Sequence, residues 1–293
     1  MTEVPANTVV VGVDGSETSD RAVDWAAEQA RLEGRALTLV QATGAMGTAA
    51  LVWLDQAGVD SEVTREAVRR DAEQLLAAAG ERVAALAPDV PAHGVVAELD
   101  PRDALRETAR SAVMVVLGSR GRGPVKSLLL GSVAHAVSRD GACPVVVLRP
   151  VAESVVRRGI VVGVDAQGTS TAALAFAYRL ASLRRRPLRV VHAIWDAHQG
   201  EEPVGPDEEG YDAERLRLAQ TVAGMAEQYP DVEVETVLAR GLVDRVLVRL
   251  AEEAELVVIG RRSRGGIAGL VRGRTASIVV EQSSGTVAVV PEP

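Results

Sequence analysis

Three glycines and a serine in the first half of the chain have the spacing of a phosphate-binding loop. Gly118 and Gly121 follow a Val-rich segment, and Gly131-Ser132 comes ten residues after Gly121, which gives the pattern G-x2-G-x9-G-[ST]. Glycine adopts positive φ and lets backbone amides come within hydrogen-bond distance of phosphate oxygens. A helix that begins at Gly131-Ser132 would direct its free N–H groups and the positive end of its dipole toward the same anion. The pattern therefore predicts a phosphate site.

Neighbouring side chains fit the same chemistry. Arg120 and Arg122 could screen phosphate charge, and Ser132 could donate a hydroxyl hydrogen bond. The structural alternative is that the glycines form a tight turn and that Ser132 is a helix N-cap, but three glycines and a hydroxyl in order after a strand favour phosphate binding. Asp14 could accept hydrogen bonds from an adenine amino group or a ribose, or could instead cap a helix that begins near Ser19.

The elements that must position these residues occur twice. The chain has 293 residues, of which 47% are apolar and 25% charged, a balance that can fill two cores. The segment that ends at Asp14 recurs at Asp165 (165 − 14 = 151), and the one that ends at Gly118 recurs at Gly260 (260 − 118 = 142). The repeat predicts three parts: a domain over residues 1–149, a linker over 150–156 and a second domain over 157–293.

Short apolar segments alternate with helix-length segments inside each copy. Five segments of the first copy are continuously apolar, as buried parallel strands are: Val9–Val13, Leu37–Ala42, Gly94–Glu98, Ala112–Leu117 and Val145–Leu148. The predicted helices lie between them: Ser19–Glu33, Val63–Leu86, Pro101–Arg110 and Ser132–Arg139. This order predicts an α/β fold with two homologous doubly wound domains, each a five-stranded parallel sheet flanked by helices. Ligands bind such sheets beyond the carboxyl ends of the strands, where the strand order reverses.

Four segments of the first copy carry a family resemblance: Gly12–Ser16, Gly118–Gly123, Leu128–Val133 and Cys143–Val147. They resemble the universal stress protein family, and the resemblance covers nearly the whole chain in two copies. It implies strand order 3-2-1-4-5, ATP as the ligand with Mg²⁺ able to bind through the phosphates, and self-association through the final strands or domain faces. The residues that it assigns to the nucleotide are Gly12, Asp14, Ala42, Gly118, Ser119, Arg120, Gly121, Arg122, Gly123, Pro124, Gly131, Ser132 and Val133.

The second copy departs from this pattern. Ser263 replaces the glycine that answers Gly121, and Arg274 replaces the serine that answers Ser132 at the expected helix start. Either this site has lost nucleotide, or its additional arginines bind phosphate in a different geometry; weakened or absent binding is favoured. The residues of this second, weaker site are Gly163, Asp165, Ala193, Gly260, Arg262, Arg264, Gly273, Arg274 and Thr275.

Composition excludes several classes of protein. A net charge of −8 and 2% aromatic residues argue against a nucleic-acid or anionic-membrane surface. No apolar run is long enough to span a bilayer. Cys143 is the only cysteine, which fits a reducing compartment and, with no signal peptide, a cytoplasmic location. The histidines lack ligand spacing, so no metal site is predicted, and Cys143 is expected to be a small buried residue.

The sequence thus favours an ATP-binding universal stress protein that acts as a nucleotide-dependent regulator or sensor in the stress response. Two alternatives are an interaction scaffold that binds no nucleotide and a slow ATPase. No general base or metal-binding carboxylate is evident beside the glycine loop, so no catalytic residue is named and at most weak hydrolysis is expected. A protein partner is expected, but the sequence does not identify it.

Overall fold

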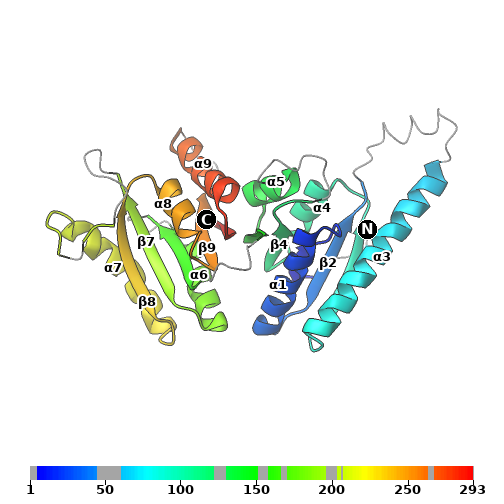
Figure 1. Cartoon of the computed structure of the whole chain (residues 1–293), viewed down its shortest axis with the longest axis horizontal. Coiled ribbons are helices and arrows are strands. Elements are labelled where there is room, and N and C mark those ends of the chain that lie inside the picture. The colour runs from blue at the N-terminus through cyan, green and yellow to red at the C-terminus, as the bar shows by residue number, and fades with distance from the viewer. Residues whose placement is uncertain are drawn as a thin grey trace. The chain divides into compact units, whose positions relative to one another are not determined.

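The computed structural model describes residues 5–44, 61–121, 130–150, 158–165, 170–195, 203–205, 207–262 and 267–292, with backbone alone for Ser61, Arg262 and residues 267–273. The chain divides into two compact units, Met1–Leu148 and Arg149–Pro293. Each unit is a parallel sheet with helices packed against it (Figure 1). The predicted α/β class is confirmed.

The sheet of the N-terminal unit is built from short Val-rich segments. Its strands are β1 (Val9–Gly12), β2 (Leu37–Ala42), β3 (Ala92–Ala97), β4 (Met114–Gly118) and β5 (Val145–Leu148). They pair in parallel in the order β3-β2-β1-β4-β5, as the family resemblance implies. The central strand is inaccessible to solvent along Val9, Val10 and Val11, because helices cover both faces. The order reverses at β1, which pairs with β2 on one side and β4 on the other.

The described helices between these strands are α1 (Glu17–Glu33), α3 (Ser61–Leu86), α4 (Pro101–Thr108) and α5 (Ser132–Asp140). Helix α1 buries a stripe of small residues that includes Ala22, Ala26 and Ala30. It ends at Gly34, whose left-handed φ of 61° allows its N–H to bond back to the last turn. Helix α1 lies beside α3, and α4 beside α5 (Figure 1).

The C-terminal unit repeats the plan. Its strands are β6 (Ile160–Val164), β7 (Leu188–Ile194), β8 (Val234–Arg240), β9 (Leu256–Arg262) and β10 (Thr286–Glu292). Its helices are α6 (Thr171–Arg184), α7 (Asp212–Gln228), α8 (Val243–Leu250) and α9 (Ile267–Gln282). The parallel pairings follow the order β8-β7-β6-β9-β10, which is the order of the first unit.

One helix differs from the expectation. The sequence comparison expects the last helix of the second unit to begin at Gly273-Arg274, as α5 begins at Ser132, whereas α9 begins at Ile267. Gly273 and Arg274, which correspond to Gly131 and Ser132, therefore lie inside a helix. Within the described part of the chain, no helix combines the length and apolarity needed to cross a bilayer.

Candidate functional site

A cavity of about 410 Å³ opens at the carboxyl ends of β1, β2 and β4, at the switch point of the N-terminal sheet. The predicted site residues that the structure brings to it are Gly12, Asp14, Ala42, Gly118, Ser119, Arg120, Gly121, Gly131, Ser132 and Val133. Arg122, Gly123 and Pro124 lie outside the described residues. The apolar wall comes from residues that the motif does not include: Val13, Val40, Pro101, Leu105 and Leu117.

Asp14 is oriented by its own chain. Its Oδ1 accepts hydrogen bonds from Ser16 N (3.0 Å) and Ser16 Oγ (2.6 Å), and its N–H donates to Ser19 Oγ (3.1 Å). The N-cap of α1 is Ser16, whose Oγ accepts from Ser19 N. The alternative that Asp14 caps this helix is thus wrong. The other carboxylate oxygen of Asp14, Oδ2, lies directly beside Gly121.

Two of the glycines are closely packed, one against a side chain and one against the backbone. A methyl group on Gly12 would come within 2.7 Å of Leu117 Cδ2, and one on Gly118 within 2.7 Å of the Thr18 carbonyl carbon. Gly118 therefore allows the strand end to lie directly against the first turn of α1. The Thr18 hydroxyl also donates to the Arg120 carbonyl, so this turn holds the start of the glycine loop.

Ser119 provides a polar group that the fold itself leaves unused. It is inaccessible to solvent, it lines the cavity, and its Oγ has no hydrogen-bond partner among the described residues. A buried hydroxyl without a partner costs about 1–3 kcal/mol. The motif identified Ser119 only as a loop residue, and its burial could not be deduced from spacing.

Helix α5 presents its N-terminus to the same cavity. Its N-cap is Gly131, in extended conformation (φ −76°, ψ 153°), with no side-chain cap, and Ser132 is the first helical residue. The alternative that Ser132 is the N-cap is therefore wrong. The first N–H groups of an α-helix have no acceptor within the helix. The N–H of Gly131 bonds to Ser119 O (2.7 Å), which ties this helix end to β4.

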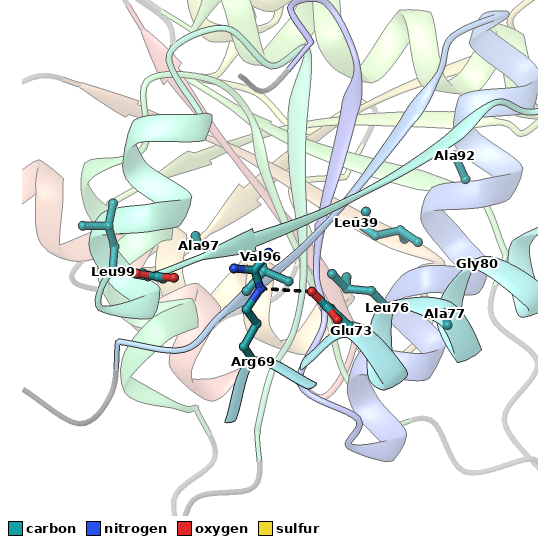
Figure 2. Close-up of a pocket in the computed structure, with 12 residues that line it drawn as sticks. Leu39, Arg69, Glu73, Leu76, Ala77, Gly80, Ala92, Val96, Ala97 and Leu99 are labelled. Carbon is teal, nitrogen blue, oxygen red and sulfur yellow. Dashed lines mark hydrogen bonds and ion pairs between the residues drawn. The ribbon is translucent and has the colours of Figure 1, made fainter. Parts of the chain in front are cut away.

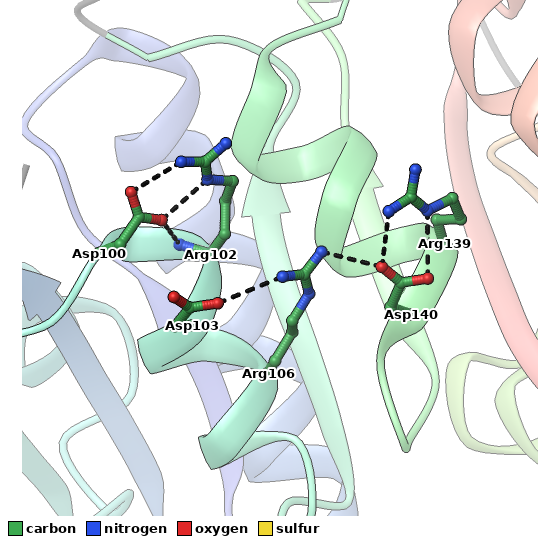
Figure 3. Close-up of polar contacts among 6 residues, drawn as sticks. All are labelled: Asp100, Arg102, Asp103, Arg106, Arg139 and Asp140. Carbon is green, nitrogen blue, oxygen red and sulfur yellow. Dashed lines mark hydrogen bonds and ion pairs between the residues drawn. The ribbon is translucent and has the colours of Figure 1, made fainter.

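An ion-pair network joins α4 to the C-terminal end of α5, the end opposite Ser132 (Figure 3). Arg106 bonds to Asp103 (3.2 Å) on its own helix and to Asp140 (2.8 Å) on α5. Arg139 also pairs with Asp140, and these arginines lower the pKa of that carboxyl group. The network fixes the C-terminal end of α5 and so its direction toward the cavity.

A larger cavity, of about 790 Å³, lies between α3 and the β2–β3 side of the sheet (Figure 2). It is bordered by the Arg69–Glu73 ion pair (3.1 Å) and by Leu76 and Val96. None of the site residues predicted from the sequence lines this cavity. The chemistry suggested by the glycine loop belongs to the smaller cavity.

The C-terminal unit has a cavity of about 620 Å³ at the corresponding sheet edge. Gly163, Asp165, Ala193, Gly260 and Thr275 line it, as expected. Arg274 is exposed and is not among the lining residues, whereas Arg264 and the side chain of Arg262 are not described. Gly273 lies within α9.

The last strand adds a carboxylate that sequence reasoning missed. Glu292 Oε1 and Oε2 accept hydrogen bonds from Ala173 N (2.9 Å) and Ala172 N (3.0 Å), in the first turn of α6. A methyl group on Gly260 would come within 2.7 Å of Glu292 Oε1. The corresponding Gly118 instead faces the backbone of α1. No motif pointed to Glu292, because it lies in a strand far along the chain.

Other histidine and cysteine predictions concern packing. His192 Nδ1 lies 3.0 Å from Val164 O at the end of β6. Cys143 is buried. Among the residues that the structure describes, no group of three or more His, Cys, Asp or Glu side chains could hold a metal ion.

Comparison with known proteins agrees with this architecture. The model of the universal stress protein family matches residues 5–149 and again 157–291. A universal stress protein of Mycolicibacterium smegmatis is 31% identical over 290 residues, which cover 96% of each chain. One of Mycobacterium tuberculosis is 34% identical over 296 residues, covering 97% of this chain and 96% of the relative. A universal stress protein structure from Archaeoglobus fulgidus superposes with a TM-score of 0.71 over 98% of this chain and 96% of the other, at 18% identity.

Proposed function

The chain belongs to the universal stress protein family, and from that premise and the geometry of the N-terminal cavity we propose that this unit binds ATP and acts as a nucleotide-dependent regulator in the stress response. The observation that carries the proposal is the convergence of anion-binding groups on one cavity. The uncapped N-terminus of α5, the buried hydroxyl of Ser119 and the glycine loop all border it.

The cavity suits a nucleotide in both shape and polarity. Its apolar wall of Val40, Leu105 and Leu117 could accept the faces of a base, and Asp14 could accept hydrogen bonds from an amino group or ribose hydroxyls. The phosphates would then extend toward Ser132, where the helix dipole and free N–H groups favour negative charge. Mg²⁺ would be bound through the phosphates.

Substitution of Ser132 tests the proposal without loss of the fold. Ser132→Asp places a carboxylate at the start of α5, which stabilises an isolated helix by roughly 0.3–1 kcal/mol but repels a triphosphate. Ser132→Asn is a neutral control of the same size. We expect ATP to raise the melting temperature of the wild type and of Ser132→Asn, because a ligand at a hundred times its Kd adds about 2.7 kcal/mol of stability. Ser132→Asp should gain no such stabilisation.

A second measurement separates this function from a scaffold. Nucleotide released from purified wild-type protein is identified by mass spectrometry. If no nucleotide is released and ATP leaves the melting temperature of the wild type unchanged, the proposal is wrong and the scaffold interpretation replaces it.

A further inference from the structure

The two cavities are alike at the end where β1 and β6 stop. In each unit the strand-end aspartate donates its N–H to a serine hydroxyl five residues later, at 3.1 Å for Asp14 and Ser19 and at 3.2 Å for Asp165 and Ser170. Two residues before each aspartate, a glycine faces a leucine of the same unit: Gly12 faces Leu105 on α4, and Gly163 faces Leu247 on α8. The alanines near the ends of β2 and β7 each line the cavity of their own unit. The second copy has therefore kept the geometry that would hold a base and sugar.

The two cavities differ at the end where phosphates would lie. In the N-terminal unit α5 begins at Ser132 and leaves its first N–H groups without acceptors in the helix. In the C-terminal unit α9 runs from Ile267, so the N–H groups of Arg274 and Thr275 lie in its interior and bond to carbonyls four residues earlier. The anion-binding helix terminus is thus missing at this position.

Glu292 makes the same region negative. It is buried, it lines the cavity, and it occupies the free N–H groups of the first turn of α6 with its own carboxylate. The described lining carries three carboxylates, on Asp165, Glu214 and Glu292, against the single guanidinium of Arg217. Arg217 is itself paired with Glu214 at 3.1 Å. Among its described residues, the N-terminal lining carries only Asp14 and Arg120 as charged groups.

Aromatic side chains border the C-terminal cavity, although the chain has only three Trp and three Tyr. Trp195 and Tyr211 both line it, and Trp195 keeps 71% of its surface exposed. The guanidinium of Arg240 lies 5.3 Å from the ring centre of Tyr211 and is neutralised by Glu208. Such rings offer stacking surfaces to a nucleobase, and the described residues of the N-terminal lining include no aromatic side chain.

We propose that the C-terminal cavity binds an uncharged nucleoside and rejects the phosphate esters of the same nucleoside. The identification of the ligand as a nucleoside rests on the proposed function, because it transfers the base-and-sugar end of the N-terminal site to its copy. The rejection of phosphate rests on Glu292 and on the continuous helix α9. One chain would then carry a nucleotide site and a nucleoside site on the same fold.

The test uses the full chain and a matched pair of variants that each fill one cavity. Ala193→Trp fills the C-terminal cavity, and Ala42→Trp fills the N-terminal one at the equivalent position. Adenosine, AMP and ATP are titrated calorimetrically. We expect adenosine binding to persist in Ala42→Trp, and binding at the C-terminal site to be lost in Ala193→Trp. In Ala42→Trp, the affinity for adenosine should be at least ten times the affinity for AMP.

Charge is tested separately with Glu292→Gln, which retains the shape of the side chain. In the Ala42→Trp background it should raise the affinity for AMP relative to adenosine by on the order of tenfold, since it removes a like charge at short range. Circular dichroism confirms that each variant is folded.

Two results would overturn the inference: no adenosine binding in Ala42→Trp, or AMP or ATP binding there as tightly as adenosine. These outcomes are independent of the N-terminal site. The proposed function fails instead if the wild type shows no ATP binding that is lost in Ala42→Trp. That result does not depend on adenosine binding.

Discussion

Gly121 lies against Asp14 so closely that a methyl group on Gly121 would overlap the Oδ2 atom of the carboxylate. This contact joins the glycine loop after β4 to the end of β1, and it gives Gly121 a role that the phosphate-loop pattern alone does not contain. The side chain that would have to move is held by two hydrogen bonds from Ser16.

Gly121→Ala should therefore act through Asp14. We expect it to destabilise the N-terminal unit by about 1–3 kcal/mol, the usual cost of overpacking, and to weaken ATP binding. Calorimetric unfolding of Gly121→Ala, Asp14→Ala and the double variant measures the coupling. Strictly additive effects on stability would show that the contact is not the cause.

Gly118→Ala and Gly260→Ala form a matched pair with different expected costs. The new methyl group meets the backbone of Thr18 in the first case and the end of the Glu292 side chain in the second. The Glu292 carboxylate can shift by weakening its hydrogen bonds from Ala172 N and Ala173 N, whereas the Thr18 backbone cannot shift without displacing the start of α1. We expect Gly118→Ala to cost about 2–3 kcal/mol and Gly260→Ala clearly less, as measured by thermal unfolding of each unit. Equal costs would contradict the packing argument.

Acid should weaken the contact between Asp100 and Arg102 at the start of α4 (Figure 3). The hydrogen bond from Arg102 lowers the pKa of Asp100 to about 2. The folded-state pKa lies below the unfolded value, so the contribution to stability is present above about pH 4 and is lost as pH falls toward 2.

Because the pair is largely exposed and screened by solvent, its contribution should be small. Asp100→Asn keeps the N-cap bond to Arg102 N and removes the charge. The stability difference between wild type and Asp100→Asn should shrink between about pH 4 and pH 2. A difference that stays constant with pH would exclude this ion pair as a source of acid sensitivity.

Cys143 should be unreactive in the folded protein. Burial raises the pKa of its thiol to about 12, so almost no thiolate is present at neutral pH. Iodoacetamide should label it only after unfolding, with a rate that follows the unfolding transition. Rapid labelling of the native protein, compared with a Cys143→Ser control, would show that the site opens locally.

The sequence was sufficient for the fold because its signals are local and repeated. The Val-rich runs identify the strands, and the same runs 151 and 142 residues later identify the second unit. Strand ends such as Gly118 were placed within one residue. The start of α9 was placed wrongly because glycine is tolerated inside a helix when neighbouring residues favour it, and the repeat suggested a break at Gly273.

The candidate site was predictable only as far as contiguous motifs reach. The glycine loop and Asp14 were identified, whereas the roles of Thr18, Ser119 and Glu292 depend on contacts across the sheet edge. The same limit applies to the ion pairs of α4 and α5. The second copy lacks these charges: Leu242, Val248 and Gln282 take the places of Asp100, Arg106 and Asp140. The sequence alone does not show that Arg106 and Asp140 form an ion pair, because they lie on different helices.

The amide-to-hydroxyl bond that both units share, from Asp14 to Ser19 and from Asp165 to Ser170, has a thermodynamic consequence. In the N-terminal unit, an arriving molecule meets a corner whose two ends, Asp14 and Ser19, are already joined by this bond. Little disorder has to be lost there on association, so affinity depends on the contacts made and not on the cost of assembling the receptor.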